Sequence, residues 1–125
     1  MAYAGIIFRK DDRFLLQLRD SNIGTKNPDQ WGIFGGGIEY TETPGQAILR
    51  EIKEEIGIQF KLEEIKLFAK TRFRGEECYV YRANFPYEIS NITLNEGKDL
   101  GLFTKEEVLR LNNTIEGLKE LIISV

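Results

Sequence analysis

Residues 35–58 read GGGIEYTETPGQAILREIKEEIGI, and they constrain the fold more than any other part of the chain. Thr43 followed three residues later by Gln46 is the pattern of a capping box, and Pro44 suits the first position of a helix. Gly57 suits the end of a helix. The sequence therefore predicts a helix from Pro44 to the residue before Gly57, directly after three consecutive glycines.

This predicted helix has an apolar face and an acidic face. With about 100° of rotation per residue, Leu49, Ile52 and Ile56 fall within an arc of about 60° and are expected to face the core. Three glutamates, with the small Ala47 among them, fall within about 100° of one another on the far side: Glu51, Glu54 and Glu55. Each like-charge pair destabilises an isolated helix by about 0.2–0.5 kcal/mol, and a bound divalent cation would reverse the sign. Taken alone, such a charged run is more typical of a solvated helix face.

The composition limits the chemistry that the chain can perform. The sequence has no histidine, which excludes zinc sites built on histidine, Ser-His-Asp triads and Cys-His pairs. A general acid or base must then be Asp, Glu, Lys, Tyr or Cys, or a metal-bound water. Oxygen ligands without histidine or cysteine favour Mg²⁺ or Mn²⁺ over zinc.

Length and charge describe a globular protein of ordinary size. The chain has 125 residues, of which 42% are hydrophobic and 30% charged, so we expect one domain spanning 1–125. The single Cys78 cannot form an internal disulfide, no apolar run reaches the length of a membrane span, and the N-terminus lacks a signal peptide. We therefore expect a cytoplasmic protein with no membrane partner. A formal net charge of -3 without a basic run argues against nucleic acid as the main partner.

The rest of the chain alternates short apolar runs with turn-forming segments. Strands are predicted at 3–8, 13–20, 31–34, 64–73 and 76–85, the last two joined by a turn at Arg74-Gly75. Loops are predicted at 21–30 and 89–100, and short helices at 104–111 and 114–124, with Thr104 and Thr114 as N-caps. This order predicts an α/β fold in which helices cover a mixed sheet.

The glycine-rich stretch also carries residues at fixed spacing. Gly36 is followed after five residues by Glu42, and after seven more by REIKEEIGI at 50–58. This pattern resembles the complete Nudix box, and the order of strands and helices around it is similar to the Nudix fold. The resemblance implies an α/β/α sandwich with a mixed β-sheet flanked by helices. It also implies hydrolysis of a nucleoside diphosphate linked to another group, with Mg²⁺ or Mn²⁺ as the cofactor.

The resemblance assigns expected roles to residues of the box. The metal-binding positions of the family are matched here by Glu51, Glu54, Glu55 and the backbone of Gly36. Arg50 and Glu42 match the positions that brace these carboxylates. Gly36 and Gly37 match the place where the chain turns closely into the helix, and Gly37 and Glu42 are expected beside the substrate.

A glutamate outside the box is a further candidate. Glu96 in LNEGKDLGLF matches a loop glutamate that many nucleotide-type members use as a metal ligand or base. The same residue, beside Gly97, fits an exposed turn equally well. The general base is therefore either Glu54 or Glu96, and the expected catalytic set is Glu51, Glu54, Arg50 and Glu96.

The substrate is less constrained than the reaction. NPDQWGIFGGG at 27–37 resembles the segment before the box in members that clean oxidised or unwanted nucleoside triphosphates, and in some ADP-ribose members. Aromatic side chains that could stack on a base, most of them expected in the core, are Trp31, Phe34, Phe73, Tyr79, Tyr81 and Phe85. We expect Trp31 and Phe34 to contact a (deoxy)nucleoside triphosphate or oxidised nucleotide, which is converted to a nucleoside monophosphate.

Other functions and assemblies stay open at this point. Within the same family, the alternatives are an ADP-ribose or nucleotide-sugar pyrophosphatase and an RNA 5′-end pyrophosphohydrolase, the latter disfavoured by the acidic balance. A non-catalytic nucleotide-binding regulatory Nudix domain would usually lack box carboxylates, and none is missing here. The expected partner is a small nucleotide, and a homodimer is not excluded.

Overall fold

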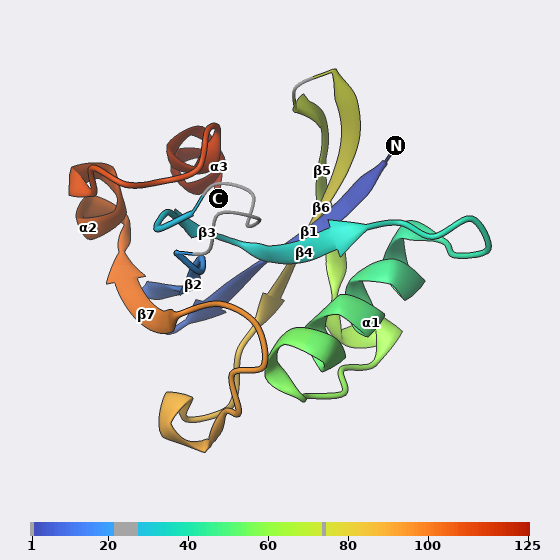
Figure 1. The fold of residues 1–125 in the computed structure, drawn as a ribbon, viewed down its shortest axis with the longest axis horizontal. Coiled ribbons are helices and arrows are strands. Elements are labelled where there is room, and N and C mark those ends of the chain that lie inside the picture. Colours follow the sequence, from blue (N-terminus) through green and yellow to red (C-terminus); the bar gives the residue numbers. More distant parts are fainter. Residues whose placement is uncertain (1, 22–27, 74) are drawn as a thin grey trace.

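The computed structural model describes residues 2–21, 28–73 and 75–125 (Figure 1), with Phe73 described by its backbone alone. The strands are β1 (Tyr3–Lys10), β2 (Arg13–Leu18), β3 (Trp31–Gly32), β4 (Phe34–Gly37), β5 (Lys66–Phe73), β6 (Glu76–Asn84) and β7 (Asp99–Thr104). The helices are α1 (Pro44–Ile56), α2 (Lys105–Arg110) and α3 (Leu118–Ser124), with short 3-10 turns at Leu62–Glu64 and Ile89–Asn91.

The strands form one mixed sheet around β1. β1 runs parallel to β6 and antiparallel to β2 and β4, and the strand order is β3-β2-β1-β6-β5. β4 pairs with the first half of β1, where Gly35 lies opposite Gly5 and Gly37 opposite Tyr3. β7 pairs with β2 along its length. The segment before α1 is therefore fixed to the centre of the sheet.

Helices cover both faces of this sheet (Figure 1). On one face α1 packs Ile48, Ile52 and Ile56 against a core that includes Ile6 and Phe8 of β1. On the other face, α2 and α3 bury their own apolar side chains against the sheet: Val108, Leu118 and Ile122. The predicted α/β/α sandwich with a mixed sheet is confirmed.

The predicted ends of α1 are also confirmed. The Thr43 hydroxyl accepts a hydrogen bond of 3.2 Å from the Gln46 amide, and the Gln46 side chain accepts one of 2.9 Å from the Thr43 amide. Gly57 ends the helix in the left-handed conformation, at φ 72°, and its N–H donates to the Lys53 carbonyl. Such caps satisfy backbone groups that a helix end leaves unpaired. They fix both ends of α1, and so the position of the helical turns that carry Glu51, Glu54 and Glu55.

The predicted buried face of α1 was partly wrong. Ile52 and Ile56 are buried as expected, but the third fully buried isoleucine is Ile48, and Leu49 packs at the margin of the core. Ala47, expected among the glutamates, is buried in the same cluster. The buried arc is therefore rotated toward the glutamates, because α1 packs on β1 and β4 together.

Three other predictions need correction. The three glycines lie in strand β4 and not in the turn into the helix, and 99–104 forms β7, which the sequence did not predict. Thr104 caps α2 as expected, but Thr114 does not cap α3. Gly117, at φ 86°, precedes α3 instead, and Thr114 forms a bridge with Trp31. Most of the loop predicted at 21–30, and Arg74 of the predicted turn, lie outside the described residues.

The helices of the described part of the chain are short, and none of them is both long and apolar enough to cross a membrane.

Candidate active site

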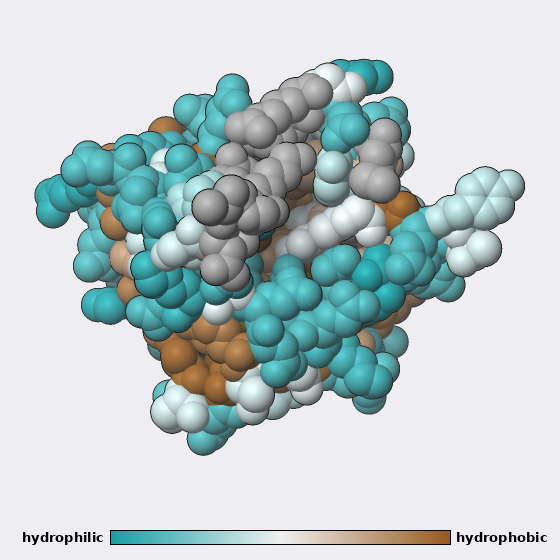
Figure 2. Space-filling model, in the orientation of Figure 1, coloured by the Kyte–Doolittle hydropathy of each residue, from teal (hydrophilic) through white to brown (hydrophobic). Residues whose placement is uncertain are grey.

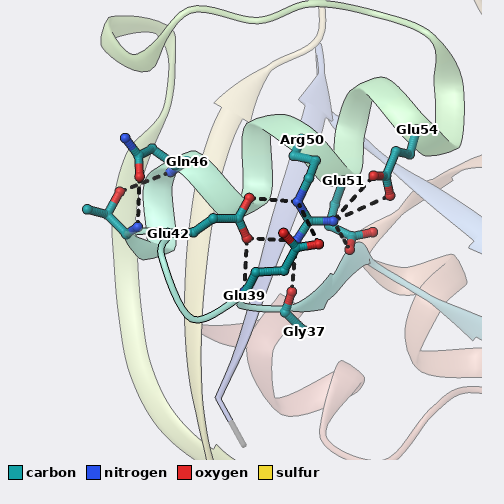
Figure 3. Close-up of polar contacts among 8 residues, drawn as sticks. Gly37, Glu39, Glu42, Gln46, Arg50, Glu51 and Glu54 are labelled. Atoms are coloured by element: carbon teal, nitrogen blue, oxygen red, sulfur yellow. Dashed lines mark hydrogen bonds and ion pairs between the residues drawn. The ribbon is translucent and has the colours of Figure 1, made fainter.

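The side chain of Arg50 ties the segment between β4 and α1 to the helix (Figure 3). Its Nε lies 2.6 Å from Oε2 of Glu42, and its Nη2 lies 2.8 Å from Oε1 of the same carboxylate. Nη2 also donates to the carbonyl of Gly37, at 3.0 Å. Hydrogen bonds from Arg50, and then from the Glu39 amide, lower the pKa of Glu42 to about 2, and the pKa of Arg50 is raised. The predicted brace between Arg50 and Glu42 is therefore present as a two-pronged ion pair.

The same guanidinium reaches two of the predicted metal-binding carboxylates. Nη1 of Arg50 lies 2.9 Å from Oε1 of Glu51 and 3.4 Å from both oxygens of Glu54. The side chain of Glu51 is 12% exposed, whereas that of Glu54 is 49% exposed. Hydrophilic side chains cover this side of α1 in Figure 2. Glu54 is therefore the member of the acidic run that solvent reaches most freely.

Glu55 is buried, which corrects the prediction that it shares the outer face of the helix. The residue is 3% exposed, and its Oε2 accepts a hydrogen bond of 3.3 Å from the Gly35 amide. Burial, followed by the charges of Glu51 and Glu96, raises the pKa of Glu55 to about 8. Arg19 opposes this rise, but as a minor contribution. A buried carboxylate with so little compensation is unusual outside functional sites.

Gly36 makes room for the carboxylate of Glu51. A Cβ atom at Gly36 would clash with the Glu51 carboxyl group, so any larger residue would displace it. Burial raises the pKa of Glu51, the ion pair with Arg50 lowers it, and the charges of Glu54 and Glu96 raise it further. The carboxyl group of Glu51, from α1, thus packs directly against the backbone of Gly36, in β4.

The loop before β7 brings Glu96 near the end of α1 that carries Glu55. The amide of Asn95 donates a hydrogen bond of 2.8 Å to the backbone carbonyl of Glu55, so this loop lies against the end of α1. The side chain of Glu96 is exposed, and its charge acts on both Glu51 and Glu55. The structure thus shows the exposed turn that the sequence allows, and the charge of Glu96 also acts on the acidic cluster, so its role as metal ligand or base stays a prediction.

Comparisons with known proteins agree with this arrangement. The chain matches the NUDIX domain family over residues 1–122. It therefore belongs to the NUDIX family. A protein from Streptomyces ambofaciens called MutT-like protein is 32% identical over 108 residues, which cover 86% of this Nudix chain and 66% of that protein. Nucleoside triphosphatase NudI from Enterobacter sp. (strain 638) is 33% identical over 132 residues, which cover 90% of this chain and 93% of that protein.

Other relatives match a shorter segment or the fold alone. Human diphosphoinositol polyphosphate phosphohydrolase NUDT4B is 41% identical over 58 residues, which cover 46% of this chain and 32% of that protein. The Nudix chain thus spans about two thirds of the Streptomyces protein and about a third of the human one. The structure of DR0079 from Deinococcus radiodurans matches with a TM-score of 0.81 at 15% identity, covering 98% of this chain and 81% of that one. The NUDIX domain of Shewanella oneidensis NrtR, complexed with ADP ribose, matches with a TM-score of 0.76 at 20% identity, covering 98% and 84%.

The chain is thus a member of a hydrolase family that typically depends on divalent metals, and its residues suit such an ion. The cluster offers carboxylate oxygens without histidine or thiolate, which matches the preference of Mg²⁺ and Mn²⁺. Within the described residues, however, no group of three or more acidic or cysteine side chains is arranged to hold an ion. In the structure, the carboxylates of Glu51 and Glu54 instead contact Nη1 of Arg50, at 2.9 Å and 3.4 Å.

The residues predicted to contact substrate differ in how accessible they are. Phe34 is fully buried and packs against Phe8, with ring centroids 5.8 Å apart, so the prediction that it stacks on a base is wrong. Trp31 is partly exposed and packs edge-on against Phe103, so its contact with substrate stays a prediction. Both oxygens of Glu42 are engaged by Arg50, which suits a brace better than a substrate contact.

The remaining aromatic candidates add little to the site. Phe85 is buried in the core, Tyr79 and Tyr81 are half-buried on β6, and the side chain of Phe73 lies outside the described residues.

Two polar residues of β2 and its end were missed by the sequence analysis. Gln17 is buried and contacts the Glu96 loop, and Arg19 acts on the charge of Glu55. In the part of the chain that the structure describes, the buried Nε of Arg19 has no hydrogen-bond partner. The available signal was the pair of polar residues that interrupt the apolar run RFLLQLRD.

Proposed function

We propose that this chain hydrolyses a phosphoanhydride bond of a nucleoside triphosphate, with Mg²⁺ or Mn²⁺, and releases a nucleoside monophosphate. One observation carries the proposal: the charges of Glu51 and Glu96 act on the buried Glu55, and that carboxyl group has no cation of its own in contact among the described residues. An arrangement that costs free energy in the protein alone becomes favourable when a cation completes it.

Four carboxylates would hold the metal, with the carbonyl of Gly36 as a further oxygen: Glu51, Glu54, Glu55 and Glu96. A bound Mg²⁺ or Mn²⁺ offsets the negative charge of the diphosphate and makes a water molecule more acidic. Arg50 keeps Glu51 and Glu54 close to their working positions through its contacts with Glu42 and Gly37. A carboxylate must also accept a proton from the attacking water, and the exposed Glu54 and Glu96 both suit this role.

The substrate proposal rests on relatives and on the segment before α1. Two relatives that cover most of the chain are named MutT-like protein and nucleoside triphosphatase NudI, which favours a nucleoside triphosphate. The structural match to a NUDIX domain complexed with ADP ribose supports ADP-ribose as the second candidate. Diphosphoinositol polyphosphate ranks third, because that relative matches over less than half of the chain.

The test is a chromatographic screen for hydrolysis products over four classes of compound, run with Mg²⁺ and with Mn²⁺; a nucleoside triphosphate should give a nucleoside monophosphate and pyrophosphate. The panel contains canonical and oxidised nucleoside triphosphates, ADP-ribose with nucleotide sugars, dinucleoside polyphosphates and capped RNA, and a diphosphoinositol polyphosphate. We expect the highest kcat/KM for a nucleoside triphosphate, with a nucleoside monophosphate as product and no turnover in excess chelator. A far higher kcat/KM for ADP-ribose would overturn the substrate proposal but not the reaction.

The non-catalytic alternative has its own signature in the same experiment. A regulatory domain would bind a nucleotide or ADP-ribose, seen as a rise in melting temperature, without hydrolysing it at millimolar metal. The intact set of box carboxylates favours catalysis. Binding without turnover across the whole panel would reverse that preference.

A further inference from the structure

Gln17 is a buried polar residue that contacts the loop carrying Glu96 of the proposed site. Among the described residues the buried polar or charged side chains are Gln17, 5% exposed, and Glu55. Gln17 lies in β2, between its register partners Gly32 of β3 and Leu100 of β7. Its Nε2 donates a hydrogen bond of 2.6 Å to the backbone carbonyl of Glu96. A buried amide costs free energy unless it is hydrogen-bonded, so Gln17 and the Glu96 loop depend on each other.

The loop that carries Glu96 is fastened on both sides of that contact. The amide of Asn95 donates to the carbonyl of Glu55 at 2.8 Å, and the amide of Lys98 donates to the carbonyl of Leu18 at 2.7 Å. The first bond joins the loop to α1, and the second joins it to β2. Gln17 supplies the bond between them, at the backbone carbonyl of Glu96, the residue whose charge acts on Glu51 and Glu55.

The turn after Glu96 is shaped to the amide of Gln17. Gly97 has φ +94°, a conformation that other residues adopt only with strain. A Cβ atom there would lie 2.6 Å from Nε2 and 2.8 Å from Cγ of Gln17. The backbone at Gly97 therefore lies directly on the Gln17 side chain, which leaves the loop little freedom to move away.

We propose that Gln17 is a positioning residue that holds the backbone of Glu96 so that its carboxylate stays turned toward Glu51 and Glu55. The inference rests on the proposed function, in which Glu96 helps to hold the metal. Gln17 itself touches neither metal nor substrate in this proposal. Its effect passes through one hydrogen bond to the loop, and the same bond satisfies its own buried amide.

The direct test replaces Gln17 by methionine, which keeps the length of the side chain and removes the donor. Residues that orient metal ligands typically change metal affinity by about 10–100-fold when they are substituted. We therefore expect Gln17→Met to weaken Mn²⁺ binding, measured by calorimetry, by about tenfold or more. The matched control is Gln59→Met, at an exposed glutamine of the described chain, which should bind Mn²⁺ as the wild type does.

Hydrogen exchange of the metal-free protein gives a readout that does not depend on activity. Gln17→Met should speed amide exchange at Asn95 and Lys98, and should leave the amides of β1 and β6 unchanged. Gly97→Ala approaches the same contact from the loop and should weaken Mn²⁺ binding in a protein that keeps Gln17. Wild-type affinity in both variants would overturn the inference, as would unchanged exchange in the loop.

A double-mutant comparison separates positioning from a general loss of stability. If Gln17 acts through Glu96, then Gln17→Met should change Mn²⁺ affinity by less than about twofold in a Glu96→Gln background. Equal effects in both backgrounds would overturn the inference. If the wild type binds Mn²⁺ but hydrolyses no compound of the panel, the proposed function fails while these results still decide the role of Gln17.

Discussion

The acidic cluster at α1 has two halves that differ in how their charges are balanced. In the first half, Arg50 contacts three carboxylates at 2.6–3.4 Å, those of Glu42, Glu51 and Glu54. In the second half, Glu55 and Glu96 have no contact with a basic side chain among the described residues, and Glu55 is buried. We call these the Arg50 half and the Glu55 half.

This difference in charge balance distinguishes groups that hold the site in shape from groups that are available to a ligand. Paired charges with good geometry hold a loop and a helix in register, and they need no further partner. A buried carboxyl group without a cation nearby keeps its proton to higher pH, as Glu55 does, and a bound cation would favour its ionised form. The structural ion pairs and the proposed binding groups thus meet on α1, and Glu51 and Glu54 belong to both.

The largest expected effect is on turnover, at the exposed end of the Arg50 half. Glu54→Gln keeps the shape of the side chain and removes one charge. Turnover should fall by about a hundredfold or more, because a metal ligand or general base has been lost. Without metal the melting temperature should hold or rise slightly, since the contacts of Glu54 with Arg50 are long, at 3.4 Å, and the side chain is 49% exposed.

Paired melting curves with and without Mg²⁺, recorded with turnover on the best substrate, check this prediction. The rise in melting temperature on adding Mg²⁺ should shrink, because it follows the affinity of the folded state. Glu63→Gln, at an exposed glutamate outside the cluster, is the matched control and should behave as the wild type. A Glu54→Gln protein with wild-type turnover and metal response would place the site elsewhere.

The second effect is on stability and belongs to the Arg50 half alone. Arg50→Met removes the hydrogen bonds to Glu42 and Gly37 and leaves neighbouring carboxylates without a partner. We expect a loss of about 1–3 kcal/mol in the free energy of unfolding, less than for a buried pair because the Arg50 side chain is 25% exposed. Urea denaturation at neutral pH, in chelator, measures it. Unchanged stability would mean that the two halves do not differ as the contacts indicate.

The third effect depends on pH and belongs to the Glu55 half. The pKa of Glu55 in the folded state is about 8, above its ordinary value of 4.5. Between these values the folded state holds a proton that the unfolded chain has released, so the stability of the metal-free protein falls as pH rises. Glu55→Gln removes this loss and keeps an acceptor for the Gly35 amide. At pH 8 the variant should be more stable by about 1–3 kcal/mol, with little difference near pH 4.5.

The same variant should lose its response to metal. Melting curves in chelator and in Mn²⁺, recorded from pH 4.5 to 8.5, measure both effects together. A wild-type protein whose stability in chelator does not fall over this interval would show that Glu55 is ionised and compensated, which would remove the contrast between the two halves.

The sequence predicted the Arg50 half better than the Glu55 half, and the reason is physical. The caps at Thr43 and Gly57 are local interactions within reach of sequence reasoning, and the pairing of Glu42 with Arg50 was expected from the resemblance to the Nudix box. The rotation of α1 against the sheet is set by its packing on β1 and on the glycine-rich strand β4. The helical spacing gave the order of residues around the axis but not which side would be covered, so the burial of Glu55 was not predicted.

Tertiary pairing explains the other differences between sequence and structure. β7 contains Gly101 and follows a loop, and it becomes a strand because β2 pairs with it from Arg13 to Leu18. The approach of Glu96 depends on the same pairing and on Gln17, and a polar residue within RFLLQLRD does not show which loop it contacts. Thr114 is a good N-cap residue, but its segment instead bridges Trp31, an interaction across more than 80 positions of the chain.

The smallest expected effect tests whether Glu39 belongs to the Arg50 half. Glu39 lies next to Glu42 in the segment before α1, but its Oε1 is 3.8 Å from Nε of Arg50 and its side chain is 66% exposed, against 2.6 Å and 14% for Glu42. Exposed ion pairs of this length contribute little, so Glu39→Gln should change the free energy of unfolding by less than about 0.5 kcal/mol. Glu42→Gln should clearly lower the melting temperature at neutral pH.

The contribution of Glu42 should also vanish in acid, and that of Glu39 should not be seen at all. With its pKa lowered to about 2 in the folded state, Glu42 stabilises the protein fully above pH 4.5, and this stabilisation is lost as pH falls toward 2. The melting temperatures of the wild type and Glu42→Gln should therefore converge on acidification, while Glu39→Gln follows the wild type throughout. Equal effects of the two substitutions at neutral pH would show that the net negative charge of the segment, and not the short contacts of Arg50, holds it to α1.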